Sequence, residues 1–179
     1  MTSKVAVITG ATSGIGVGLV AGYRGRGWAV VATDGSIRPS TDPDVLTVAG
    51  DLAEPETADR VIGGALDRFG RIDTLVVAGH GLAGFFWLTQ RAIAEMAIRY
   101  GGHVVTVLAT GDLVAATRSL AAEYAVYGIR VNAVRPSGRP GQIGGVVEGV
   151  LFLESAPGIT GEILHLDGGP AAGSSGHVP

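Results

Sequence analysis

The stretch that decides the fold runs from Val5 to Gly16 and reads VAVIT followed by GATSGIG. Its first five residues are apolar or β-branched, as expected of a buried central strand in a parallel sheet. Glycines at positions 10, 14 and 16 predict a tight turn, and a helical pattern follows from Gly14 to Arg26. This order of strand, turn and helix presents backbone N–H groups to a pyrophosphate. The alternative is a glycine turn that only packs a helix on a strand.

Short apolar strands alternate with helical patterns along the rest of the chain. We expect strands over residues 28–33, 45–48, 74–78, 104–108, 130–134 and 163–166, and helices over 55–69, 85–100, 113–127 and 146–153. This alternation predicts a doubly wound, Rossmann-like α/β fold, with a parallel sheet covered by helices on both faces. We expect one domain over residues 1–170, followed by a flexible tail over residues 171–179, which are rich in Gly and Ser.

The composition excludes several classes of protein. The chain has 179 residues, 46% of them hydrophobic, and no cysteine, which excludes disulfide frameworks and thiolate chemistry. A formal net charge of −3 gives no basic surface for nucleic acid. No apolar run is long enough to span a membrane, and the first residues lead into a strand without a secretory pattern. We therefore expect a cytoplasmic protein that binds neither nucleic acid nor membranes.

Two acidic residues follow strands near the predicted nucleotide site. Asp34 closes the second strand, 24 residues beyond Gly10. A carboxylate at this place accepts hydrogen bonds from an adenosine ribose and repels a 2′-phosphate. Asp51 follows the third strand, where two interpretations remain open: it contacts the adenine end of a nucleotide, or it starts the turn before the next helix.

These residues resemble the short-chain dehydrogenase/reductase family over nearly the whole chain. The resemblance is carried by Thr9 to Gly16, Asp51-Leu52, Ala78-Gly79, Gly102 to Leu108, Ser119 to Asn132, Pro136, Ile159 to Glu162, and Asp167 to Gly169. It implies hydride transfer between a nicotinamide cofactor and an alcohol or carbonyl substrate. It also implies a homo-oligomer, a dimer or tetramer, with the last helix and strand near a subunit contact.

The resemblance also extends the set of candidate cofactor residues. Asp34 and the uncharged Ser13 favour NAD over NADP, whereas Arg38 is either a weak argument for NADP or a solvated loop charge. The predicted cofactor-binding residues are Gly10, Thr12, Ser13, Gly14, Ile15, Gly16, Asp34, Asp51, Leu52, Ala78 and Gly79.

The catalytic residues of the family have no counterpart in the sequence. The family uses a tyrosine with a lysine one helical turn later, and a serine. Lys4 is the only lysine, so no Tyr-x-x-x-Lys can be drawn, and Ala109 and Thr110 stand where the serine and the lysine are expected. The differences gather near residues 79–81, 109–112 and 137–142. Either the sequence omits mobile active-site loops, or the protein has lost them. The catalytic residues are therefore unassigned.

Three functions follow from these alternatives. The first is an NAD-linked oxidoreductase, and the second is a catalytically inactive homologue that binds the nucleotide. The third is a partner-binding homologue with an empty cleft. His80 is either an acid or base near this cleft or a loop histidine, and His103 is expected to be structural or exposed. Phe85 and Phe86 are expected to line a substrate pocket, form an interface or pack in the core.

Overall fold

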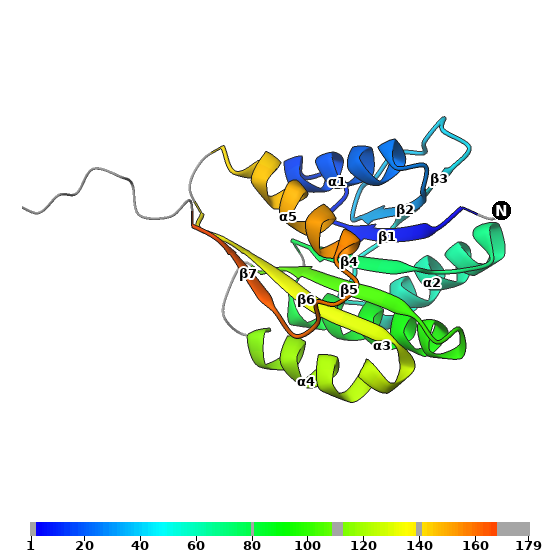
Figure 1. Ribbon diagram of the computed structural model, residues 1–179. Coiled ribbons are helices and arrows are strands. Elements are labelled where there is room, and N and C mark those ends of the chain that lie inside the picture. The colour runs from blue at the N-terminus through cyan, green and yellow to red at the C-terminus, as the bar shows by residue number, and fades with distance from the viewer. Residues whose placement is uncertain (1–2, 80, 109–112, 139–140, 168–179) are drawn as a thin grey trace, which may run out of the picture.

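The computed structural model describes residues 3–79, 81–108, 113–138 and 141–167 and contains a seven-stranded parallel sheet (Figure 1). The strands lie in the order β3-β2-β1-β4-β5-β6-β7. They are β1 (Val5–Thr9), β2 (Ala29–Asp34), β3 (Val45–Ala49), β4 (Thr74–Ala78), β5 (Gly102–Val107), β6 (Ile129–Pro136) and β7 (Ile163–Leu166). The helices are α1 (Gly14–Gly25), α2 (Pro55–Phe69), α3 (Leu82–Ile98), α4 (Val114–Tyr124) with the short 3₁₀ turn η1 (Ala125–Tyr127), and α5 (Ile143–Ser155).

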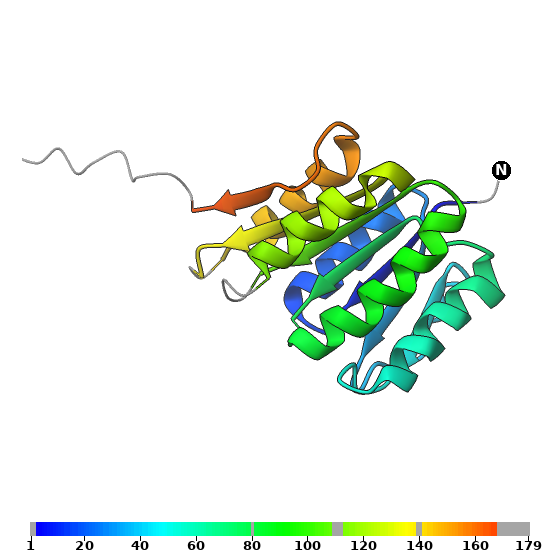
Figure 2. The same ribbon diagram turned by 90° about the horizontal axis from the view of Figure 1, so that it is seen from below.

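Helices cover both faces of the sheet. The helices α1 and α5 lie together on one face, and α2, α3 and α4 lie on the other, as Figures 1 and 2 show. Each face has its own apolar core, one built on Val7 and Val31 and the other on Ile8 and Val30. Successive residues of β1 and β2 therefore alternate between two buried faces, which is why these strands read as continuous apolar runs. The predicted doubly wound fold is confirmed.

The helix ends that the sequence predicted well are set by proline and glycine residues. Pro55 occupies the first turn of α2, where its missing N–H costs nothing, and Glu56 lies near the positive end of the helix dipole. Gly70 then ends α2 in a left-handed conformation, with φ of 75°. Because both signals are local, the bounds of α2 agree with the prediction. Similarly, Gly27, with φ of 76°, follows the end of α1.

Other elements are longer or shorter than the sequence predicted. The helix α3 begins at Leu82, whose side chain is exposed, so the apolar periodicity used for the prediction starts only at Phe85. The helix α5 begins at Ile143, three residues before the predicted start, and β6 continues to Pro136. The predicted tail at residues 171–179 lies outside the described residues, as do His80 and residues 109–112 and 139–140.

The connection from β2 to β3 contains no helix. Parallel strands are usually joined through a helix, but residues 35–44 form only turns, bends and irregular backbone. Ion pairs hold this connection: Arg24, in the last turn of α1, donates to Asp42 at 2.9 Å and to Asp44 at 3.0 Å. The guanidinium also bonds the carbonyl of Trp28 at 2.5 Å, which fixes it between the helix and the start of β2.

A stripe of glycines on α1 lets α5 approach closely. Gly14, Gly18 and Gly22 recur at every fourth position and therefore share one face of the helix. A β-carbon added to these glycines would lie 2.7–2.8 Å from side-chain atoms of α5. The α5 residues are Ile143, Val147 and Leu151, which recur at the same interval. Branched side chains of one helix thus pack directly on the backbone of the other.

Among the described residues, no helix combines the length and the apolar character needed to cross a membrane.

Candidate cofactor site

The glycine turn between β1 and α1 folds back on itself. Gly10 has a φ of 61°, a conformation that side chains with a β-carbon rarely adopt, and its carbonyl accepts a hydrogen bond from Ser13 N at 2.9 Å. A β-carbon on Gly16 would lie 2.0 Å from the Gly10 carbonyl oxygen. The turn therefore requires glycine at Gly16 for lack of space, because the obstacle is backbone that cannot move aside.

The N-terminus of α1 presents N–H groups at this turn. Ser13 is the N-cap, and its hydroxyl accepts a hydrogen bond from Gly16 N at 3.0 Å. The first backbone bond that closes onto the cap runs from Val17 N to Ser13 O. The N–H groups of Gly14 and Ile15 precede it, so no carbonyl inside the helix satisfies them. Together with the helix dipole, they make this end of α1 suitable for an anion.

Asp34 lies beside the same turn. Its Oδ2 accepts hydrogen bonds from Thr12 N at 3.1 Å and from Thr12 Oγ1 at 2.6 Å. Its Oδ1 accepts one from Gly35 N at 2.7 Å. The carboxylate therefore faces the turn, which brings two of the predicted cofactor residues into direct contact.

The pair Asp51-Leu52 has mainly structural contacts. Asp51 Oδ1 accepts a hydrogen bond from Ala53 N at 2.9 Å, which is the turn-forming role that the sequence left open. The side chain of Leu52 is buried in the core beneath α2. Gly50 N donates to the carbonyl of Asp34 at 3.1 Å, so Asp51 follows directly after a residue bonded to the end of β2.

Thr9 joins the carboxyl ends of β1 and β4. Its hydroxyl donates to the carbonyl of Ala78 at 3.0 Å and accepts from the N–H of Ala78 at 2.8 Å. Ala78 is buried, whereas Gly79 is exposed with φ of 77°. The link between Thr9 and Ala78 could not be predicted from the sequence, because the two residues are 69 positions apart.

A pocket of about 290 Å³ adjoins the start of α1. It lies on the β6 side of this helix, whereas Asp34 at the end of β2 lies on the other side. It lies between the first turn of α1, the end of β6 and the start of α5. Gln142 shapes its rim, since its side-chain oxygen accepts from Ser137 N at 3.1 Å and its nitrogen donates to Leu166 O at 3.0 Å. The lining residues are Ile15, Pro136, Gly138, Gly141, Gln142, Ile143 and Val146. Of these, only Ile15 was among the predicted cofactor residues.

The tyrosines and the lysine of the chain lie toward the amino ends of the strands, whereas the glycine turn lies at their carboxyl ends. Lys4 precedes β1, Tyr100 precedes β5, and Tyr127 precedes β6, so all three are at the amino ends of parallel strands. Tyr23 and Tyr124 are in the last turns of α1 and α4, which return to that same edge. No tyrosine–lysine pair of this chain can therefore act beside the glycine turn.

A buried polar cluster occupies this opposite edge. His103 Nδ1 lies 3.0 Å from Glu154 Oε2, which also accepts hydrogen bonds from Thr74 Oγ1 at 2.7 Å and Tyr23 OH at 3.2 Å. Arg130 donates to the carbonyl of Leu153 at 2.8 Å. The cluster joins the end of α5 to α1, β4, β5 and β6, far from the glycine turn, and thus has a structural role.

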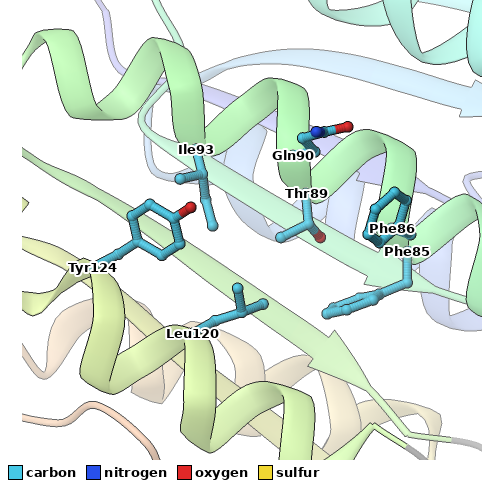
Figure 3. Close-up of a pocket in the computed structure, with 7 residues that line it drawn as sticks. All are labelled: Phe85, Phe86, Thr89, Gln90, Ile93, Leu120 and Tyr124. Carbon is cyan, nitrogen blue, oxygen red and sulfur yellow. The ribbon is translucent and has the colours of Figure 1, made fainter.

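A second pocket, of about 190 Å³, lies between α3 and α4 (Figure 3). Phe85 is buried in the core, Phe86 is 53% exposed, and the hydroxyl of Thr89 is buried without a hydrogen-bond partner. The lining residues are Phe85, Phe86, Thr89, Gln90, Ile93, Leu120 and Tyr124. Both phenylalanines thus line this pocket, and Phe85 also packs in the core.

The described part of the chain contains no group of three or more His, Asp or Glu residues that could hold a metal ion.

Comparison with known sequences agrees with this geometry. The family described as short chain dehydrogenase matches residues 4–115. The 1,6-dihydroxycyclohexa-2,4-diene-1-carboxylate dehydrogenase of Pseudomonas putida is 32% identical over 185 residues, which take in 79% of this chain and 69% of the relative. The oxidoreductase UcpA of Escherichia coli K12 is 31% identical over 182 residues, with 76% and 69% covered.

Solved structures show the same fold. The 3-ketoacyl-(acyl-carrier-protein) reductase of Brucella melitensis, solved in complex with NADH, superposes with a TM-score of 0.81 at 25% identity. The superposition covers 93% of this chain and 97% of the reductase.

The alignments also reveal missing segments. The stretch matched to the Pseudomonas enzyme is 185 residues long, longer than the 179 residues of the whole chain, although only 79% of the chain takes part. The relative therefore carries segments that have no counterpart here. This agrees with the expectation that loops of the family are short or absent in this sequence, while their positions near residues 79–81, 109–112 and 137–142 remain a prediction.

Proposed function

Because the chain belongs to the short-chain dehydrogenase family of oxidoreductases, we propose that it binds NAD(H) at the carboxyl edge of its sheet. There it transfers a hydride between this cofactor and a small alcohol or carbonyl compound, in the cytoplasm. The observation that carries the proposal is the contact of Asp34 with the glycine turn at the start of α1. The contact supports the proposal because a helix end suited to an anion and a carboxylate suited to a ribose hydroxyl then lie side by side.

Different residues of the proposed site would contact different parts of the cofactor. The N–H groups of Gly14 and Ile15 would hold the pyrophosphate, and Asp34 would accept hydrogen bonds from the adenosine ribose. The pocket beside Ile15 and Pro136 would receive the nicotinamide half. Nicotinamide, when bound, supplies or accepts the hydride. Apolar side chains such as Ile143 and Val146 would exclude water from that pocket.

A second candidate function is nucleotide binding without catalysis. The observation that favours it is the position of every tyrosine and of Lys4 toward the edge opposite the glycine turn. An oxidoreductase of this family then needs a proton donor other than a tyrosine of this chain. The two functions share the nucleotide site and differ only in turnover.

Nucleotide binding distinguishes these two functions from the third alternative, a homologue whose cleft binds no nucleotide. Titration calorimetry with NAD⁺, NADH and NADP⁺ should show binding of the first two with micromolar affinity, and the Asp34→Asn variant should bind NAD⁺ more weakly. Oxidation of NADH, followed at 340 nm with a panel of ketones and aldehydes, then distinguishes enzyme from binding module. If the folded protein binds no dinucleotide, both functions are excluded.

We also propose that the chain forms a homo-oligomer. Among the residues that the structure describes, β7 is the last strand of the sheet and no strand pairs with its outer edge, and Phe152 on the adjacent α5 is 52% exposed. Light scattering should give a multiple of 18.1 kDa, and Phe152→Glu should dissociate the assembly. If Phe86→Glu dissociates it instead, the contact lies at the pocket between α3 and α4.

A further inference from the structure

Thr12 and Gly35 donate hydrogen bonds to the carboxylate of Asp34. Thr12 supplies two of them to Oδ2, one from its N–H at 3.1 Å and one from its hydroxyl at 2.6 Å. Gly35 N supplies the third to Oδ1 at 2.7 Å. Because both oxygens carry donors, the plane of the carboxylate is fixed and its charge lies against the turn. Hydrogen bonds to an ionised acceptor are shorter and stronger than neutral ones.

The backbone around this contact is fixed independently of the Thr12 hydroxyl. On one side, Ala11 N donates to the carbonyl of Thr33 at 3.2 Å and ties the turn to β2. On the other side, Gly50 N donates to the carbonyl of Asp34 at 3.1 Å and ties β2 to the end of β3. The hydroxyl therefore supplies the shortest of the bonds that orient the carboxylate, and it is not needed to hold the strand or the turn.

We propose that Thr12 is a positioning residue for nucleotide selection, and that its hydroxyl directs the Asp34 carboxylate so that the site prefers NAD to NADP. This inference rests on the proposed function, because it concerns how the same site distinguishes two nucleotides. A ribose hydroxyl donates a hydrogen bond to a carboxylate, whereas a 2′-phosphate carries negative charge to it.

The orientation matters because the site is exposed to solvent. Thr12 is exposed and Asp34 is half-buried. A carboxylate released from the turn can rotate toward bulk water, where salt and solvent screen its repulsion of a phosphate. A carboxylate fixed beside the turn keeps both its hydrogen-bonding geometry and its repulsion. Thr12 thus affects the two nucleotides in opposite directions.

The test is the pair of variants Thr12→Val and Thr12→Ser. Valine keeps the size and β-branching of threonine and replaces the hydroxyl with a methyl group, while serine keeps the hydroxyl and lacks the methyl group. Titration calorimetry gives Kd for NAD⁺ and NADP⁺ with each purified protein. In Thr12→Val, we expect the ratio of Kd for NADP⁺ to Kd for NAD⁺ to fall roughly tenfold, the effect of one hydrogen bond to a charged group. In Thr12→Ser, the ratio should stay within about twofold of the original.

The possible results separate the inference from the proposed function. An unchanged ratio in Thr12→Val, or equal losses of affinity for both nucleotides, overturns the role of Thr12 and leaves the NAD site in place. Failure of the unmodified, folded protein to bind either nucleotide overturns both. Circular dichroism melting of the three proteins shows whether each is folded, and because other bonds hold the backbone at Thr12, we expect Tm values that differ by only a few degrees.

Discussion

His103 Nδ1 and Glu154 Oε2 lie 3.0 Å apart, which ties β5 to the last turn of α5 within the buried cluster. The Nε2 atom of the same ring lies 3.1 Å from Asn132 Nδ2, which is a donor. An imidazole that donates through Nδ1 and accepts through Nε2 is neutral. The burial of His103 and the position of Arg130 within the cluster therefore both favour the uncharged ring.

This arrangement predicts a loss of stability as the pH falls. Burial lowers the pKa of His103 below 6.5, although Glu154 acts in the opposite direction. In the unfolded chain the ring takes up a proton as the pH falls through 6.5, and in the folded chain it does not, so unfolding becomes more favourable. Tm should therefore decrease between pH 7.5 and pH 5. In His103→Gln this decrease should be shallower, whereas in the exposed control His165→Gln it should be unchanged.

A second decrease should follow at lower pH because of Glu154. Burial alone would raise the pKa of Glu154, but the hydrogen bonds from His103 and Thr74 and the charge of Arg130 outweigh it, so the pKa lies below 4.5. The stability that this carboxylate contributes is present above pH 4.5 and is lost as the pH falls below that value. Denaturant titrations at pH 7 should show that Glu154→Ala loses about 3–5 kcal/mol, because its partners remain buried. The exposed control Glu162→Ala should lose under about 0.5 kcal/mol.

Substitution of Gly16 should abolish the glycine turn. In Gly16→Ala the new β-carbon meets the carbonyl of Gly10 at 2.0 Å, so the turn or the first turn of α1 has to shift. We expect at least a tenfold loss of NAD⁺ affinity by calorimetry, together with a lower Tm. The matched control is Gly25→Ala at the other end of α1, where nothing outside the adjoining backbone of the helix lies within 4 Å of the added carbon. That control should keep its affinity, and equal losses in both variants would contradict the prediction.

Filling the glycine stripe should push α5 away from α1. In Gly18→Val the side chain meets Val147, whose Cγ2 already lies 2.8 Å from the position of the β-carbon. Overpacking of this kind costs about 1–3 kcal/mol, measured by urea unfolding. The double variant Gly18→Val with Val147→Ala should recover part of the loss, because the second change makes room for the first. Additive losses would show that the two positions do not interact.

The sequence predicted those parts of the fold that depend on local signals. Pro55 and Gly70 mark the ends of α2, and the buried strands β1 and β4 read as apolar runs. The start of α3 was missed because Leu82 is apolar yet exposed, so it lies outside the periodic pattern that begins at Phe85. Local patterns therefore gave the order and type of the elements, but not every boundary.

For the candidate site too, the sequence predicted local features but not the contacts between distant residues. The glycine turn and Asp34 follow from their places at strand ends, and the structure brings them together. The contact between Thr12 and Asp34 depends on the path of the turn, which residue spacing does not specify. The pairing of His103 with Glu154 joins residues 51 positions apart, and a polar side chain in a strand gives no sign of its partner. Contacts of this kind require the folded chain.

The glycine stripe on α1 has a consequence for protein engineering. Because Ile143, Val147 and Leu151 rest on bare backbone, larger side chains at these three positions have nowhere to go. On the pocket wall that does not touch α1, Gly138 and Gly141 have φ of 76° and 85°, where any side chain would strain the backbone, so Gln142 is the position best suited to substitution. Variants at Gln142 would change the shape of the cavity without separating the two helices that support it.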